Sequence, residues 1–164
     1  MTLITSNPLL ERLPAYETPQ QMMNAIAFHP LANINTKELS FIQKDALLVG
    51  EKSILAPTKK SLLAALTWYG MLRTGYANRN PVLIENKRKY YQQLNGQGLP
   101  DFSSGAPTKG MSVNVIKGPT GTGKTITIQR FCASLPQVIE HGKNEAAGWL
   151  YHKQLVYLLS LIHI

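Results

Sequence analysis

The sequence predicts an α/β protein in which a helical N-terminal region precedes the first part of a parallel sheet. Three observations carry this prediction. Apolar residues alternate over 111–117, as in a half-buried strand, and a glycine-rich run follows at 118–125. Residues 125–135 then have the composition of a helix that Pro136 ends. The apolar, β-rich run 154–159 suits a buried parallel strand.

The chain divides into four predicted segments, which differ in composition. Residues 1–57 form an N-terminal arm with helices, 58–95 form a helical region, 96–110 form a linker, and 111–164 contain the first part of the sheet. The linker prediction rests on glycine, proline and serine, which interrupt regular structure and are common in loops.

Capping residues and apolar spacing place the individual helices. Thr18-Pro19-Gln20-Gln21 combines a threonine cap, a proline at the first helical position and a glutamine three residues after the cap. Thr36 is the expected cap of a second helix, and Gly75 the expected end of a third. The first 20 residues, with three prolines, suggest an extended arm. The predicted helices cover residues 19–29, 36–48, 58–72 and 85–94, and a short strand is expected at 137–141.

Composition limits the classes of protein that remain. The chain is 44% hydrophobic and 16% charged, which excludes a wholly disordered protein. Its net charge of +8 favours polyanionic partners such as nucleic acid. Cys132 is the single cysteine, so the chain has no internal disulfide. We expect Cys132 to be a small, buried apolar residue. The start lacks the features of a signal peptide, and no apolar run is long enough to span a bilayer, so we expect a cytoplasmic protein without a membrane partner.

The eight residues 118–125, Gly-Pro-Thr-Gly-Thr-Gly-Lys-Thr, match the phosphate-binding pattern G-x-x-x-x-G-K-[ST] at every fixed position. Glycines allow the backbone to wrap closely around an anion, with successive N–H groups and the N-terminus of the next helix directed at phosphate oxygens. The sequence therefore predicts a P-loop that binds a nucleotide. Its expected cofactor-binding residues are Gly118, Thr120, Gly121, Thr122, Gly123, Lys124 and Thr125.

Two side chains of the loop have separate predicted roles. Lys124 places a flexible ammonium against the β- and γ-phosphates, and Thr125 offers its hydroxyl to Mg²⁺. We therefore expect a nucleotide and Mg²⁺ as cofactors, and this pattern alone does not distinguish ATP from GTP.

Catalytic residues for hydrolysis are not assigned from the sequence. Hydrolysis requires an acidic pair at the end of a second core strand, and Glu140 and Glu145 are the only acids after Thr125. Neither follows a long apolar run, so both are expected to be surface carboxylates. No arginine follows Arg130 that could reach a neighbouring subunit. The chain is therefore expected to bind ATP without hydrolysing it.

The order of several stretches along residues 17–158 resembles the TnsC/TniB-like AAA+ ATPases of cut-and-paste transposons. The phosphate loop is specific by itself, whereas the other stretches are informative through their order. The stretches are 60–75, Arg79-Asn80-Pro81, 116–125, Phe131-Cys132, 135–141 and 154–158.

The resemblance implies an ATPase that assembles on DNA as a homo-oligomer and connects target-site selection to transposase subunits. In similar proteins the strand matching 154–158 leads to an acidic Mg²⁺-binding strand, whereas this sequence departs from the pattern at Leu159 and ends at Ile164. We therefore expect a C-terminally truncated member. Two alternatives remain open: a P-loop NTPase or kinase-like protein unrelated to DNA, and an inactive fragment.

Other conspicuous residues have a functional and a structural interpretation. The run 87–91, Lys-Arg-Lys-Tyr-Tyr, is typical of nucleic-acid contacts, but a solvated basic helix with inward tyrosines is the favoured interpretation. Trp68 and Tyr69 are expected in the core rather than against an adenine ring. His141, beside Gly142, is expected in a surface turn.

Overall fold

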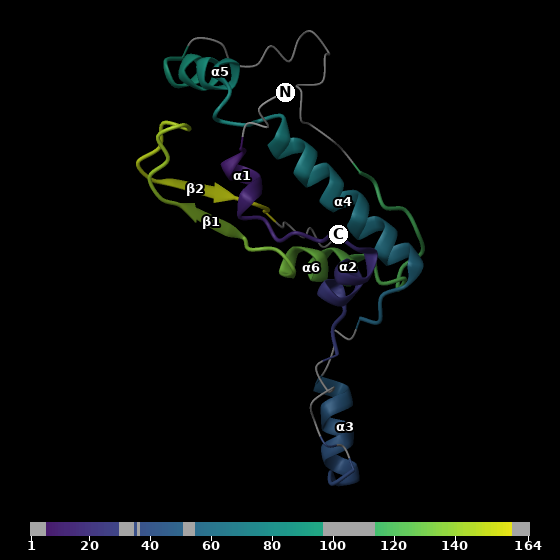
Figure 1. The fold of residues 1–164 in the computed structure, drawn as a ribbon. Coiled ribbons are helices and arrows are strands. Elements are labelled where there is room, and N and C mark those ends of the chain that lie inside the picture. Colours follow the sequence, from purple (N-terminus) through teal and green to yellow (C-terminus); the bar gives the residue numbers. More distant parts are fainter. Residues whose placement is uncertain (1–5, 30–34, 36, 51–54, 97–113, 159–164) are drawn as a thin grey trace. The chain divides into compact units, whose positions relative to one another are not determined.

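A computed structural model describes residues 6–29, 35, 37–50, 55–96 and 114–158 (Figure 1). The chain forms two compact units, each assembled from separate stretches of sequence. The first unit contains Met1–Ala15, Thr67–Val115 and Leu135–Ile164. The second unit contains Tyr16–Leu66 and Ile116–Ser134.

The first unit is a β-hairpin with helical segments. Its elements are α1 (Pro8–Glu11), the later part of α4 (Lys59–Ala77), α5 (Ile84–Leu94), β1 (Val138–His141) and β2 (His152–Leu155). Its buried apolar residues come from α1, α4 and β1 and from segments that flank the helices and strands, so residues distant in sequence form one core. They are Leu9, Leu13, Tyr69, Tyr76, Leu135, Ile139, Ala147 and Val156.

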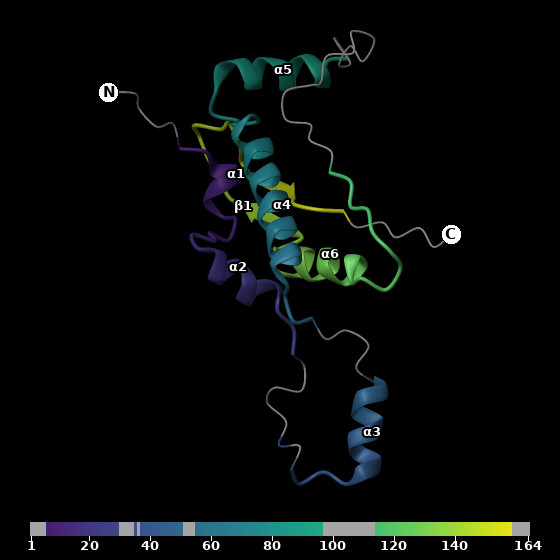
Figure 2. The same cartoon turned by 90° about the vertical axis from the view of Figure 1, so that its right-hand side faces the viewer.

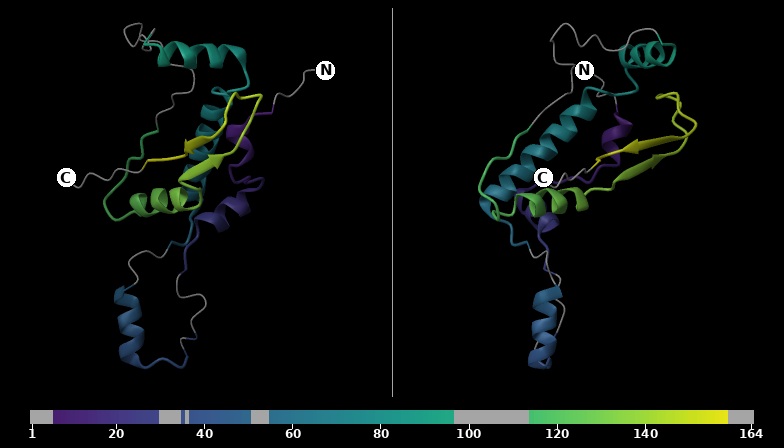
Figure 3. Two further views of the ribbon diagram at one scale, coloured as in Figure 1. Left: turned by 90° about the vertical axis from the view of Figure 1, so that its left-hand side faces the viewer. Right: turned by 180° about the vertical axis from the view of Figure 1, so that it is seen from behind.

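Strands β1 and β2 pair antiparallel, with Val138 opposite Leu155 and His141 opposite His152 (Figure 3). The predicted short strand at 137–141 is confirmed by β1. The prediction that 154–159 form a parallel strand is wrong for this pairing, since the strand spans 152–155 and runs opposite to β1. Only residues 142–151 connect the two strands, and a parallel connection needs a dozen residues or more. The connection instead turns back through a bridge between Asn144 and Trp149.

The N-terminal segment is not simply the extended arm that its prolines suggest, because it contains α1. The Asn7 side chain caps this helix by accepting a hydrogen bond from the Leu9 N–H at 3.1 Å, and Pro8 occupies the first helical position. Asn7 Nδ2 also donates to the Tyr76 carbonyl at 2.9 Å. One asparagine therefore both starts α1 and connects it to α4.

Side chains from this unit hydrogen-bond both outer edges of the hairpin. Arg12 Nη1 donates to the Glu140 carbonyl of β1 at 2.7 Å, and the Tyr76 hydroxyl donates to the Leu155 carbonyl of β2 at 2.9 Å. Unpaired strand edges promote association with other chains, and these bonds occupy one carbonyl on each edge.

The second unit contains α2 (Pro19–Ile26), α3 (Phe41–Gly50), the beginning of α4 and α6 (Lys124–Ala133). Helix α2 packs against α6, and Figure 2 shows both beside the beginning of α4. Met22 and Ile26 of α2 are fully buried, one turn apart on the same face. The remaining buried apolar residues of this unit are Leu55, Ala65, Phe131 and Cys132.

The predicted start of α2 is confirmed in detail. The Gln21 N–H donates to Thr18 Oγ1 at 3.2 Å, and the Thr18 N–H donates to Gln21 Oε1 at 3.2 Å, which together form a capping box. The helix ends at Ile26, before the predicted limit at Pro30, and Ala27 is the C-cap in an extended conformation.

Replacing Thr18 with alanine should lower the free energy of unfolding by about 1 kcal/mol, because an orphan N–H of α2 loses its acceptor. Urea denaturation followed by circular dichroism measures the change. Thr18→Ser retains the hydroxyl and should stay close to the unmodified protein. Equal stability of the alanine and serine variants would contradict this role for the cap.

Two other predicted helix boundaries are wrong. Helix α3 begins at Phe41 because Ser40 and Gln43 form a reciprocal pair of hydrogen bonds, and the expected cap Thr36 lies outside the described residues. Helix α4 starts after Thr58 as predicted but continues past Gly75 to Ala77. Gly75 is buried in the helix, where its small size is compatible with close packing, and so it does not act as a terminator. The predicted helix 85–94 is confirmed by α5.

Across 6–29, 37–50, 55–96 and 114–158, no helix combines the length and the apolar character that crossing a membrane requires.

Candidate functional site

The candidate site is the glycine-rich loop 118–123 together with the first turn of α6, all within the second unit. The helix predicted at 125–135 is present at 124–133, so it begins at Lys124 directly after the loop. The strand expected before the loop is not observed in its described part, since residues 114–117 have no regular structure. The rest of that predicted strand, 111–113, lies outside the described residues.

Two glycines give the loop its shape. Gly121 has a φ of 81° and Gly123 a φ of 77°, both in the left-handed region that disfavours side chains. Gly123 is also the N-cap of α6 and provides no side-chain cap, so the first N–H groups of the helix are left without the usual side-chain acceptor. Exposed N–H groups at a helix N-terminus favour an anion.

Lys124 bends back over the loop that precedes it. Its ammonium Nζ donates to the carbonyl of Gly118 at 2.9 Å and to the carbonyl of Pro119 at 2.6 Å. The Thr122 hydroxyl donates to the same Pro119 carbonyl at 2.9 Å. The loop is therefore curled, with a positive charge held at its mouth, which is the electrostatic setting that a phosphate group requires.

The other predicted site residues occupy consistent places in this arrangement. Thr120 and Gly121 form the exposed turn of the loop, and Thr125 is exposed in the first turn of α6, next to Lys124. Thr127, which was not predicted as a site residue, is buried and donates its hydroxyl to the Gly123 carbonyl at 2.8 Å. Thr127 therefore fixes the junction between loop and helix.

The acidic residues after the loop lie where the sequence predicts, on the surface. Glu140 pairs with Lys153 at 3.2 Å and Glu145 with Lys143 at 2.7 Å. Hydrogen bonds from Tyr151 and Lys153 lower the pKa of the exposed Glu140 carboxyl. Within the described part of the chain, no three histidine, cysteine, aspartate or glutamate side chains form a group that could hold a metal ion.

The prediction for His141 is wrong. It lies in β1 rather than a surface turn, it is only 5% exposed, and its Nε2 is 2.8 Å from Gln154 Oε1. Gln154 Nε2 donates to the Leu9 carbonyl at 3.1 Å. Because that carbonyl only accepts, the amide oxygen must face His141, and the His141 Nε2 must carry a proton. The strand alternation that buries Ile139 also buries His141, and this was the available signal.

An aromatic cluster surrounds His141 at the end of the hairpin. The Trp149 ring stacks on His152 with centroids 4.2 Å apart, and the centroids of His141 and His152 are 5.9 Å apart. Burial, followed by the proximity of His141, lowers the pKa of His152.

This lowered pKa predicts a specific dependence of stability on pH. Below about 6.5, the ordinary histidine pKa, the unfolded chain binds a proton that His152 in the folded chain binds less readily. The free energy of unfolding should therefore fall as pH decreases below that value. Urea denaturation between pH 7.5 and 5.5 tests this, and His152→Gln should show a smaller decrease. An equally large decrease in the variant would exclude His152 as the cause.

The remaining predictions have mixed outcomes. Cys132 is buried as expected, and burial raises the pKa of its thiol. Tyr69 is in the core as expected, whereas Trp68 is only part-buried. The inward orientation expected for the tyrosines of α5 is wrong for Tyr91, which is 56% exposed, and the Tyr90 side chain lies outside the described residues.

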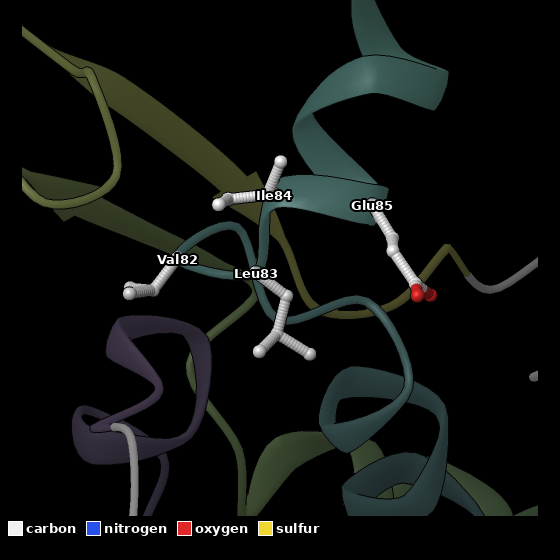
Figure 4. Close-up of a pocket in the computed structure, with 4 residues that line it drawn as sticks. All are labelled: Val82, Leu83, Ile84 and Glu85. Carbon is white, nitrogen blue, oxygen red and sulfur yellow. The ribbon is translucent and has the colours of Figure 1, made fainter.

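One further hollow, of about 460 Å³, is lined by Val82, Leu83, Ile84 and Glu85 at the start of α5 (Figure 4). It belongs to the first unit, whereas the phosphate loop belongs to the second, so it is not part of the candidate site.

Comparisons with protein-family models, with curated proteins and with solved structures found no match to the chain.

Proposed function

We propose that the chain binds ATP with Mg²⁺ through residues 118–125. The most direct support is a complete phosphate-loop sequence that leads into the N-terminus of α6. The ammonium of its lysine, Lys124, lies over the loop. When a phosphate binds, Lys124 would donate to its anionic oxygens instead of to the two carbonyls. Hydrogen bonds to anionic oxygens are stronger because they are charge-assisted.

Each residue has a distinct part in this proposal. The N–H groups of Gly121, Thr122 and Gly123 and of the first turn of α6 contact the phosphates. The Thr125 hydroxyl would be one ligand of Mg²⁺, which would neutralise phosphate charge there. No catalytic carboxylate is assigned, and the chain is proposed to bind ATP without hydrolysing it.

The biological role that we propose is DNA transposition, as a TnsC/TniB-like AAA+ ATPase in the cytoplasm. The ordered stretches between residues 17 and 158 support it through their resemblance to that family. Under this proposal the P-loop belongs to a parallel AAA+ sheet, and the partners are DNA, transposase subunits and further copies of the chain.

Titration with a fluorescent ATP analogue, with and without Mg²⁺, tests the nucleotide site. Mg²⁺ should tighten binding to the unmodified protein and to Thr125→Ser, which keeps the hydroxyl. Thr125→Val has a similar shape but no hydroxyl, and it should lose most of this Mg²⁺ dependence. Absence of analogue binding to the folded, unmodified protein at millimolar concentration would refute the proposal.

A further inference from the structure

Much of the positive charge of the chain lies between the later part of α4 and the end of α5. Residues 67–96 contain five cationic residues and one acidic residue, Glu85, a net charge of 5 − 1 = +4. This is half of the total charge of +8 in 30 of the 164 residues. The five cationic residues are Arg73, Arg79, Lys87, Arg88 and Lys89.

Hydrogen bonds connect the start of α5 to the segment that follows α4. Asn80 is only 5% exposed, and its side chain accepts from the Val82 N–H at 3.0 Å. Asn86 Nδ2 donates to the carbonyls of Asn78 at 3.1 Å and Asn80 at 2.9 Å. We call residues 73–91 the α4–α5 elbow, and Figure 2 shows α5 leaving the end of α4.

Two arginines of the elbow are oriented by tyrosine and backbone groups rather than by carboxylates. Arg73 Nη1 lies 3.0 Å from the Tyr69 hydroxyl, and the guanidinium is 5.6 Å from that ring. Arg79 Nε donates to the Gly75 carbonyl at 3.2 Å, and its guanidinium is 5.7 Å from the Tyr76 ring. Both residues are exposed.

Helix α5 contributes further cations to the elbow. Arg88 is exposed, and the 56% exposed Tyr91 lies three residues further on, along the same side of the helix. Lys87 Nζ donates to the Ala146 carbonyl at 2.6 Å. The described side chains of the elbow cations are those of Arg73, Arg79, Lys87 and Arg88. None of them lies within ion-pair distance of a carboxylate in the described part of the chain, since both ion pairs found there join other residues.

We propose that the α4–α5 elbow binds the phosphate backbone of nucleic acid. Unneutralised guanidinium groups match phosphate oxygens, and an exposed tyrosine beside Arg88 suits stacking on an unpaired base. Nucleic acid supplies phosphates at a regular spacing, and each cation that neutralises one releases a counterion. The inference rests on the proposed DNA partner but not on the nucleotide site, because the elbow and residues 118–125 share no residue.

Fluorescence anisotropy with a labelled single-stranded and a labelled duplex DNA, at several salt concentrations, tests the elbow. The variant Arg73→Gln/Arg79→Gln/Arg88→Gln removes three charges. It should bind at least about tenfold more weakly at 0.1 M salt, and the salt slope for duplex DNA should decrease by about 2.7 if each arginine neutralises one phosphate. The matched control, Lys44→Gln/Lys59→Gln/Lys60→Gln, removes three exposed charges elsewhere and should retain binding.

A single substitution that makes the elbow more positive keeps the proposal testable if the triple variant fails to fold. Glu85→Gln removes the one acid of residues 67–96 and should tighten DNA binding with a steeper salt slope. Equal losses in the elbow and control variants, or no change in either, would overturn the proposal. The proposal would also be overturned if polyglutamate competed for the elbow as effectively as DNA, because the elbow would then suit an acidic protein. The elbow variant should bind the fluorescent ATP analogue as the unmodified protein does, which separates failure of the elbow from failure of the nucleotide site.

Discussion

Lys124→Ala should weaken binding of ATP by roughly 10- to 150-fold. The substitution removes the ammonium that lies 2.6–2.9 Å from the carbonyls of Gly118 and Pro119 and that is proposed to bind the β- and γ-phosphates. Hydrogen bonds to charged groups contribute about 1.5–3 kcal/mol, and each 1.4 kcal/mol corresponds to about a tenfold change in dissociation constant. Isothermal titration calorimetry with ATP and Mg²⁺ measures the effect directly.

The same substitution should leave stability almost unchanged. The carbonyl partners of Lys124 are exposed and regain water, so the free energy of unfolding should change by no more than about 0.5 kcal/mol. Lys117→Ala is the matched control because it removes an exposed charge one residue before the loop. Lys117→Ala should bind ATP as tightly as the unmodified protein. If Lys124→Ala did so too, the assignment of the loop would be wrong.

Met22→Ala should lower the free energy of unfolding by about 2–5 kcal/mol, the range measured when large buried apolar side chains are truncated. Met22 is fully buried in α2, and α2 packs against α6 in the second unit. The deleted atoms leave a cavity that neighbouring side chains fill only in part. Urea denaturation measures the loss, and hydrogen exchange should show faster exchange of the amides of α6.

Met22→Leu is the control for this prediction, because it keeps the volume and should cost less than about 1.5 kcal/mol. Asn24→Ala alters an exposed residue of the same helix and should cost about 0.5 kcal/mol or less. A loss in Met22→Ala no greater than that in Asn24→Ala would show that α2 is not part of a packed core. Unchanged exchange in α6 would contradict the packing of α2 against it.

Elements whose signals lie within a few residues of each other were predictable from the sequence. The capping box of Thr18 and Gln21 and the cap at Thr58 act over three residues, so they are visible in the sequence itself. The same locality explains the error at α3, where Ser40 and Gln43 form an equally local pair that competes with the expected cap at Thr36. Where two caps are close, the helix they start depends on the rest of the structure.

Pairing direction and burial were not predictable in this way. A β-rich run at 154–159 is compatible with a parallel or an antiparallel partner. The pairing is antiparallel because the connection through 142–151 is too short for a parallel one. Residue His141 looks like a turn residue beside Gly142, yet its partner Gln154 is 13 positions away, and Gln154 bonds a carbonyl 145 positions away.

The sequence by itself determined the candidate phosphate loop, because a phosphate-binding loop depends on residue types at fixed spacing within eight positions. It also determined the excess of positive charge and the helix that contains the basic run 87–89. The tertiary structure alone decided that Lys124 bends back over Gly118, that Arg73 and Arg79 contact tyrosines, and that residues 7–14 pack with the hairpin. These features depend on contacts between side chains and backbone brought together by folding, and no local pattern of residues encodes which distant groups will meet.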